Sequence, residues 1–306
     1  MSIGNTGSTN LLTELSDSLA NAVATGARSI VRIDARRRIG ATGIIWRADG
    51  LIVTADHVLE REDDITVGLP DGRDLPARIV GRDPGTDIAV LRVDADGLTA
   101  ATISPVEARL GHLVLALGRP RGSEPMATLG VIGAVSGPWR TWRGGTIDHA
   151  IRSDATLYPG FSGGPLIDTE GRLIGMNTSF LSRGLSVTLP AAMVERVVEA
   201  LVSKGKVTRG YLGIATQPVA LPQALRSQLG LTQESGLLIV GVEPDSPAER
   251  GGLLLGDIVI AFGGQPTTDP QSLQALLGPG SAGTQQPVRV VRGGAIADTT
   301  VTVGER

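Results

Sequence analysis

The sequence predicts a mainly β protein with two domains. Its 306 residues are enough for about two domains with sizeable cores. From residue 27 onward, short runs rich in Val, Ile and Leu alternate with turns rich in Gly, Pro and Asp, which is typical of β-barrels and sandwiches. Only 3% of the residues are aromatic, so we expect cores filled by Val, Leu, Ile and Ala.

The chain is expected to begin with a flexible tail followed by a helix. Residues 1–9 are mostly polar and contain glycine. Apolar residues then recur at helical spacing over residues 10–25, with Asn10 as the N-cap and Gly26 after the end. Their positions are Leu11, Leu12, Leu15, Leu19 and Val23. We expect this face to pack on the domain that follows.

The strands of the first domain are predicted from short β-branched runs. They span residues 29–33, 43–46, 51–54, 65–69, 77–80, 88–93, 113–117 and 131–135, and further strands fall between 151 and 178. Pro70-Asp71-Gly72-Arg73 indicates a hairpin turn. An amphipathic pattern over residues 191–203 predicts a helix, which Lys204-Gly205-Lys206 is expected to end. The domain boundary is therefore placed at this point.

The second domain has its own set of elements. Strands are predicted over residues 236–242, 257–262, 288–291 and 299–303. A short helix and turn are expected over 247–253, and a helix over 270–277 begins after Asp269 as its cap.

Composition and charge exclude several classes of function. The net charge of −3 gives no reason to expect a nucleic-acid or acidic-lipid partner. The chain has no cysteine, which excludes a disulfide framework, a cysteine-ligated metal and a cysteine nucleophile. Its three histidines are widely spaced, so no His-rich metal site is expected. No run approaches the roughly 18 apolar residues of a membrane-spanning helix.

The segment 158–166, Tyr-Pro-Gly-Phe-Ser-Gly-Gly-Pro-Leu, has the character of a nucleophile loop. Glycines flank Ser162 and allow sharp turns and close approach to another molecule, while an apolar strand follows directly. A nucleophile needs such an exposed hydroxyl on a rigid base, with backbone N–H groups free to face an oxyanion. Alone, the segment fits an ordinary glycine-rich turn equally well.

Two other segments favour catalysis. Thr54-Ala55-Asp56-His57-Val58 ends an apolar run, and Asp87 stands before another one, at residues 88–91. The order His, Asp, Ser along the chain is that of chymotrypsin-like proteases. One histidine or one aspartate in such a place is more often structural, but the three together are unlike a chance arrangement.

These segments, together with residues 41–45, 49–58 and 83–91, resemble the HtrA family of trypsin-like serine proteases. The resemblance extends over residues 28–303, and residues 246–264 resemble the permuted bacterial PDZ domain of this family. It implies a chymotrypsin-like double β-barrel followed by a PDZ domain. The domains are then a tail and helix (1–26), the protease domain (27–204) and the PDZ domain (207–306).

The resemblance also implies roles for individual residues. Ser162 is expected to be the nucleophile, His57 the base and Asp87 the group that orients the imidazole. The backbone N–H groups of Gly160 and Ser162 are the expected oxyanion donors. This scheme requires neither a metal nor a cofactor.

Substrate recognition follows from the same resemblance. Leu157 and Phe180 are expected to line the pocket for the residue before the scissile bond, which should then accept apolar side chains. In the PDZ domain, the backbone of Leu212-Gly213-Ile214 is expected to bind the carboxylate of a peptide C-terminus. Leu273, Leu276 and Leu277 either border the adjoining side-chain pocket or belong to the core.

The implied activity is an endopeptidase for unfolded or damaged polypeptides, working as a homotrimer held partly through residues 10–35. The helix over 10–25 then has a second possible role, as a contact between subunits. The family usually works outside the cytoplasm. The N-terminus lacks an export signal, which favours the cytoplasm unless the sequence has been trimmed.

Phe161 departs from the pattern of the family, which usually has asparagine before the serine, and Tyr158 likewise replaces an asparagine. Two outcomes are open: the ring packs into the barrel and holds the loop, or the loop is misplaced at rest. In the second case, Phe161→Asn should raise basal activity. The departure at Phe161 also keeps open an alternative function, a proteolytically silent peptide-binding scaffold or chaperone.

Overall fold

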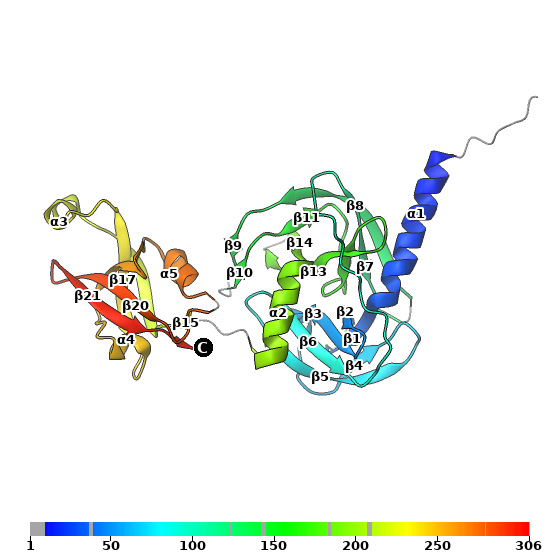
Figure 1. Ribbon diagram of the computed structural model, residues 1–306, viewed down its shortest axis with the longest axis horizontal. Helices are drawn as coiled ribbons and strands as arrows, with labels where there is room; N and C mark the ends of the chain where they lie inside the picture. The colour runs from blue at the N-terminus through cyan, green and yellow to red at the C-terminus, as the bar shows by residue number, and fades with distance from the viewer. Residues whose placement is uncertain are drawn as a thin grey trace, which may run out of the picture. The chain divides into compact units, whose positions relative to one another are not determined.

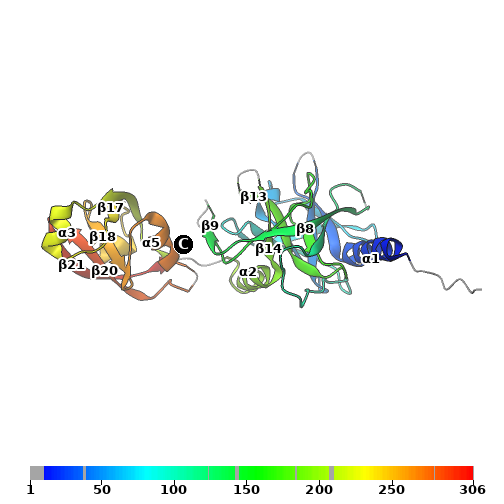
Figure 2. The same ribbon diagram turned by 90° about the horizontal axis from the view of Figure 1, so that it is seen from above.

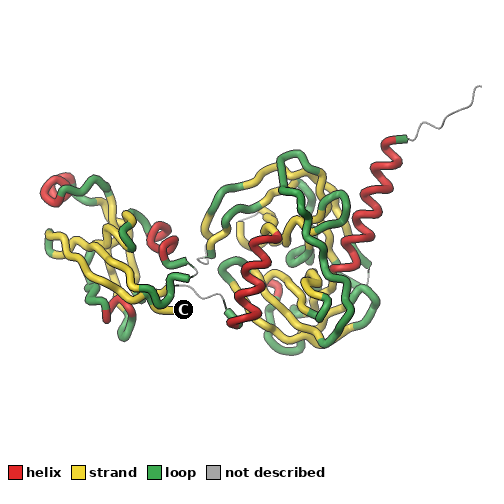
Figure 3. Tube along the Cα trace, viewed as in Figure 1, coloured by secondary structure: helices red, strands yellow, loops and turns green. Residues whose placement is uncertain are grey.

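The computed structural model describes residues 10–36, 39–122, 124–141, 145–182, 185–206, 210–278 and 280–305. The tail expected over residues 1–9 lies outside this range. The chain divides into two compact units, residues 1–206 and 207–306. Strands make up most of the regular structure in both units (Figures 1 and 3). The predicted mainly β class is confirmed.

The first barrel of unit 1 closes in the strand order β1-β2-β3-β6-β5-β4. Its neighbours are antiparallel throughout, and β3 pairs with β6 from Leu51↔Arg92 to Ala55↔Ile88. The hairpin turn predicted at residues 70–73 is confirmed, since Leu69 and Arg73 bond across it. The strands are β1 (Ile30–Asp34), β2 (Ala41–Arg47), β3 (Leu51–Ala55), β4 (Ile65–Gly68), β5 (Asp74–Asp83) and β6 (Ile88–Val93).

The second barrel closes in the order β11-β14-β13-β12-β7-β8. A two-stranded sheet of β9 (Trp139–Arg140) and β10 (Thr146–Ile147) accompanies it. Two closed barrels are the architecture expected of a chymotrypsin-like domain. The strands are β7 (Leu113–Gly118), β8 (Met126–Val135), β11 (Ile151–Ser153), β12 (Pro165–Ile167), β13 (Leu173–Ser182) and β14 (Leu185–Pro190).

Helix α1 (Leu11–Gly26) covers the barrel with only its C-terminal part. Asn10 caps it as predicted, accepting a hydrogen bond from the N–H of Leu12. Ala22 is buried against barrel residues, with Leu19 and Val23 beside it. Leu11 and Leu12 are 78% and 76% exposed, and the N-terminal end of α1 points away from the barrels in both views (Figures 1 and 2). The expected packing therefore holds for half of the apolar face.

Helix α2 (Ala191–Lys204) packs against β5 and β6 of the first barrel and β13 of the second, so it ties the two together. Gly205 ends it in the left-handed conformation, with its N–H bonded to the carbonyl of Leu201. The chain then pairs with β5 through a single β-bridge between Arg82 and Lys206.

The sheet of unit 2 has the order β16-β17-β18-β20-β21, so β16 lies at an edge. Asp269 caps α5 through a reciprocal bond with Ser272, as expected. The strands are β15 (Gly210–Tyr211), β16 (Ile214–Ala220), β17 (Ser235–Val242), β18 (Ile258–Phe262), β19 (Gln265–Pro266), β20 (Gln285–Arg292), β21 (Ala295–Thr302) and β22 (Gly304–Glu305). The helices are α3 (Gln223–Leu229), α4 (Pro247–Arg250) and α5 (Pro270–Leu276).

Aliphatic side chains fill the cores, as composition predicts. The largest wholly buried side chains nevertheless include two aromatic ones, Phe161 in unit 1 and Phe262 in unit 2. The helices of the described residues are all too short or too polar to cross a membrane.

Candidate active site

His57 lies on a single 3-10 turn, Asp56–Val58, that follows directly on β3. The turn brings its imidazole to the rim of the first barrel, where the side chain is 16% exposed. Strand β3 is buried along its whole length, which fixes the base of this turn.

Asp87 orients the imidazole from the turn between β5 and β6. Its carboxylate is buried and lies 2.8 and 3.0 Å from His57 Nδ1, and it also accepts the backbone N–H of His57 at 2.8 Å. Thr178 Oγ1 on β13 donates to the same carboxylate at 2.5 Å. With Asp87 as acceptor, the proton of the neutral imidazole sits on Nδ1 and Nε2 is left as the base.

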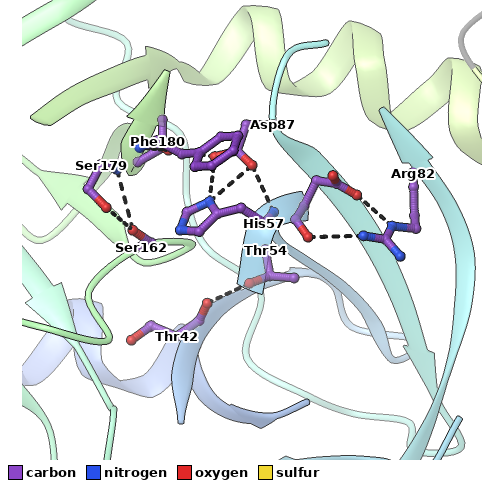
Figure 4. Close-up of polar contacts among 10 residues, drawn as sticks. Thr42, Thr54, His57, Arg82, Asp87, Ser162, Ser179 and Phe180 are labelled. Carbon is purple, nitrogen blue, oxygen red and sulfur yellow. Dashed lines mark hydrogen bonds and ion pairs between the residues drawn. The ribbon is translucent and has the colours of Figure 1, made fainter. Parts of the chain in front are cut away.

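Ser162 comes from the second barrel, on the loop before β12. Figure 4 shows it on the side of the imidazole opposite Asp87. Thr42 of β2 holds this loop to the first barrel: its N–H donates to the carbonyl of Ser162 and its hydroxyl to that of Gly160. Gly163 has φ +85°, and a Cβ there would lie 2.2 Å from the Thr42 carbonyl, so only glycine fits.

The loop leaves the two expected oxyanion donors uncommitted. Phe161, Gly163 and Gly164 each donate their N–H to a backbone carbonyl. Among the hydrogen bonds of the described residues, by contrast, the N–H groups of Gly160 and Ser162 have no acceptor. These are the donors that an oxyanion between them would need.

Phe161 holds the loop by burial. Its ring is fully buried among Val114, Ala116 and other residues of the second barrel, and meets Tyr158 edge-on. Gly118 leaves room for it, since a Cβ there would lie 2.4 Å from the ring. Of the two outcomes left open by the sequence, packing is therefore the one observed. The expectation that Phe161→Asn raises basal activity loses its basis.

A cavity of about 630 Å³ opens between the barrels beside His57 and Ser162. Leu157 lies in its wall, next to the loop of Ser162. Phe180 is placed differently: its ring stacks on the imidazole of His57 at 4.9 Å between centroids and 11° between planes. Leu157 thus lines the cavity, while Phe180 covers one face of His57 (Figure 4).

Ser179 is a site residue that the sequence did not indicate. Its hydroxyl lies 3.1 Å from Ser162 Oγ, and its N–H donates to the same oxygen at 3.4 Å. These contacts, rather than one with His57, are the hydrogen bonds of Ser162 Oγ among the described residues. Thr178 and Thr42 were missed as well, because their contacts join segments that lie far apart in the chain.

In unit 2, Leu212-Gly213-Ile214 leads into the edge strand β16. The N–H groups of Leu212 and Gly213 donate to no acceptor among the described residues. Gly213 has φ +79°, and a Cβ there would lie 2.3 Å from Ser246, so glycine is required. Leu273 is buried in the core, with Leu276 and Leu277 partly buried against it.

Comparison with known families identifies both units. Residues 41–176 match the trypsin-like peptidase domain, and residues 238–292 match the PDZ domain. A probable periplasmic serine endoprotease, DegP-like, of Halomonas elongata is 39% identical over 276 residues, covering 88% of this chain and 57% of that protein. The corresponding protein of Chlamydia trachomatis is 34% identical over 280 residues, covering 88% and 54%. The chain thus spans somewhat over half the length of these relatives.

Solved structures agree over nearly the whole chain. The HtrA-type protease AlgW, solved with a decapeptide, has a TM-score of 0.75 at 31% identity, covering 94% of this chain and 98% of that one. The serine endoprotease from Yersinia pestis gives the same values. The predicted fold, a chymotrypsin-like double barrel followed by a PDZ domain, is confirmed. The chain belongs to the HtrA family of trypsin-like serine proteases that carry a PDZ domain.

Proposed function

We propose that this protein is a serine endopeptidase that cleaves unfolded or damaged polypeptides after apolar residues. One observation carries the proposal: Asp87 holds His57 Nδ1 at 2.8 Å, and Ser162 lies in the wall of the same cavity on the other side of the ring. Such a constellation supplies a nucleophile, a base and an orienting carboxylate.

In this mechanism Ser162 Oγ attacks the scissile carbonyl while His57 Nε2 takes its proton. Asp87 stabilises the imidazolium that forms, and His57 then protonates the leaving amine. The uncommitted N–H groups of Gly160 and Ser162 are placed to stabilise the oxyanion, each contributing about 3 kcal/mol to lowering the barrier. No step calls for a metal or cofactor.

The cavity wall favours an apolar residue before the scissile bond. Leu157, together with Ile39, provides apolar surface in the cavity beside Ser162. An apolar substrate side chain gains by leaving water here.

The PDZ domain is proposed to bind the C-terminal residues of a peptide. The unbonded N–H groups of Leu212 and Gly213 suit a terminal carboxylate, and the free edge of β16 accepts the peptide as a further strand. Leu273 is buried in the core, and Leu276 and Leu277, which are partly buried against it, are proposed to border the side-chain pocket of the peptide.

We propose that the assembly is a homotrimer joined partly through residues 10–35. Leu11 and Leu12 are highly exposed and Leu15 is 43% exposed. All three lie at the N-terminal end of α1, where they form a small apolar cluster. Exposed apolar clusters of this kind mark contact sites on soluble proteins.

Digestion of casein by the wild type beside Ser162→Ala tests the activity. We expect the variant to fold and to be inactive. His57→Ala should behave in the same way, and the double variant should be little worse than either single one, because the residues act as a unit. A Ser162→Ala variant with wild-type turnover would contradict the assignment.

The contacts of Ser162 with Ser179 support one alternative, a proteolytically silent peptide-binding scaffold or chaperone. In that case the hydroxyl stays with Ser179 and is never activated by His57. A fluorophosphonate probe separates the two functions, since it labels only an activated serine. Labelling of Ser162 supports the endopeptidase, whereas absent labelling with intact peptide binding supports the scaffold.

A further inference from the structure

The turn that carries His57 begins with a buried carboxylate that the catalytic mechanism does not use. Asp56 is 1% exposed and directly precedes His57. Burying an ionised carboxylate is costly unless it is paired and hydrogen-bonded. Its partner is Arg82 on β5, whose Nε donates to Asp56 Oδ1 at 2.5 Å (Figure 4).

Arg82 also bonds to the backbone of the turn itself. Its second terminal nitrogen, Nη2, donates to the carbonyl of Asp56 at 3.3 Å and to that of Leu59 at 3.2 Å. One guanidinium therefore joins the first residue of the turn to the residue that follows it. A planar group with several fixed donors can do this, whereas a single ammonium cannot make all three bonds in the same geometry.

The turn is thus held from two sides. Asp87 holds one side: its backbone carbonyl accepts the N–H of Asp56, and its catalytic carboxylate accepts the N–H of His57. Arg82 holds the opposite side, without contact to the imidazole. Glu62 lies 3.5 Å from Arg82, but its side chain is 79% exposed, so that pair contributes little.

The backbone of Arg82 is held in place by neighbouring elements. Strand β5 pairs with β6 up to Asp83↔Ile88, and Arg82 forms a β-bridge with Lys206 after α2. Its neighbour Gly81 lies so close to the end of α2 that a Cβ there would be 2.7 Å from the carbonyl of Gly205. The backbone that carries the guanidinium is therefore fixed by both its neighbouring strand and the end of α2.

We propose that Arg82 is a positioning residue for His57, acting through the carboxylate of Asp56 and the carbonyls of the turn. The inference rests on the proposed endopeptidase function. Base and nucleophile come from different barrels, so an error in the placement of the turn changes the distance between them directly. A displacement of about 1 Å at a reacting centre can cost a hundredfold in rate.

The test must separate positioning from stability. Arg82→Met alone removes the guanidinium that bonds to the buried Asp56 carboxylate, and breaking a buried ion pair is by itself expected to destabilise the fold. The informative variant is therefore Asp56→Asn combined with Arg82→Met, which removes the charge and the clamp together. We expect it to melt near the wild type, with kcat lowered about tenfold to a hundredfold and KM within twofold. Arg82→Lys keeps the positive charge but loses the planar guanidinium, so its kcat should lie between those of the wild type and the double variant.

Arg92→Met is the matched control. Arg92 lies on the neighbouring strand β6, is similarly exposed, pairs with Asp49 and donates to its carbonyl, but does not contact the turn of His57. This variant should keep the wild-type kcat. A folded double variant with wild-type kcat, or an Arg92→Met variant with the same loss, would overturn the proposal.

A second measurement does not depend on turnover. The proton on His57 Nδ1 reports on its bond with Asp87, and its NMR shift should move in the double variant but not in Arg92→Met. If the wild type proves no more active than Ser162→Ala, the proposed function fails. The positioning role then stands or falls on this shift alone, and an unchanged shift in the double variant refutes it.

Discussion

The ring of Phe161 shows how one side chain sets the shape of the nucleophile loop. It is anchored in the second barrel one residue before Ser162, while the carbonyls on either side of it bond to Thr42 of the first barrel. The loop is thus held by burial of apolar surface in one barrel and by hydrogen bonds to the other.

Phe161→Asn is therefore expected to lower stability. Loss of the ring leaves a cavity and buries an amide, at a cost of about 3 kcal/mol or more. Peptidase activity should fall as well, because the loop loses its anchor. Melting temperature and turnover of an apolar peptide measure both, with Phe161→Leu as the control that keeps most of the apolar volume. Higher turnover in a folded Phe161→Asn variant would contradict this prediction.

Ser179→Ala is expected to raise the reactivity of Ser162. The variant removes the hydroxyl that lies 3.1 Å from the nucleophile and competes with His57 for it. One neutral hydrogen bond is worth about 1 kcal/mol, which corresponds to about fivefold in rate. The rate of fluorophosphonate labelling measures the effect. Ser104→Ala, which removes a hydroxyl bonded to Asp168, is the control and should label at the wild-type rate.

The parts of the site that the sequence predicted are those with a local pattern. Ser162 is flanked by glycines that the loop requires, and His57 and Asp87 each adjoin a buried strand. Thr178 and Ser179 gave no such signal, because their position beside Asp87 and Ser162 depends on how β13 of the second barrel packs against the first barrel. The sequence likewise gave no sign of the contact between Asp56 and Arg82, because the two residues lie 26 positions apart.

At the scale of elements, the strands of the first barrel were all predicted, most of them from apolar, β-branched runs such as β3 and β6. In the second barrel β14 was not predicted, and β8 was predicted only over its second half, because its first half is mostly exposed. Strand β16 and helix α3 of the PDZ domain were not predicted. Strand β16 is half-buried and contains Pro218, which a central strand would not tolerate but an edge strand can. Helix α3 has no fully buried residue and therefore a weak apolar pattern.

The junction of β18 and β20 predicts an acid sensitivity of the PDZ domain. Arg292 donates to both oxygens of Asp257 at 2.7 Å, and the N–H of Leu254 adds a third bond. Burial, the largest influence, raises the pKa of Asp257, but these bonds together outweigh it and hold the pKa below its usual value. The stabilisation is therefore fully present well above the unfolded pKa of about 3.9 and is lost as pH falls through the lower folded value.

Asp257→Asn should lower the stability of this domain by about 2 kcal/mol at pH 7 and leave it less dependent on pH below about 4. Urea unfolding of the full chain, followed by the NMR methyl signals of Val259 and Val290, measures both effects. Asp298→Asn is the control, since its pair with Arg289 is exposed. Equal losses in the two variants at pH 7 would contradict the prediction.

At the scale of the whole molecule, the exposed apolar N-terminal end of α1 is the feature that supports a contact with another subunit. We expect Leu11→Glu with Leu15→Glu to weaken the oligomer, because charge replaces apolar surface that the proposed contact buries. Light scattering over a range of concentrations measures the mass. Leu254→Glu, on an exposed leucine of unit 2, is the control. A wild type that is monomeric throughout would reject the oligomer.

The contact of Gly118 with Phe161 also restricts the order in which these two positions can change during evolution. While the ring is present, any side chain at 118 collides with it, so that position is closed to substitution. Once residue 161 becomes smaller, the three atoms nearest to a Cβ at 118 are gone, and we expect alanine there to fill part of the space. A return to phenylalanine is then blocked in its turn. The substitution made first at one position therefore determines which substitutions the other can later accept.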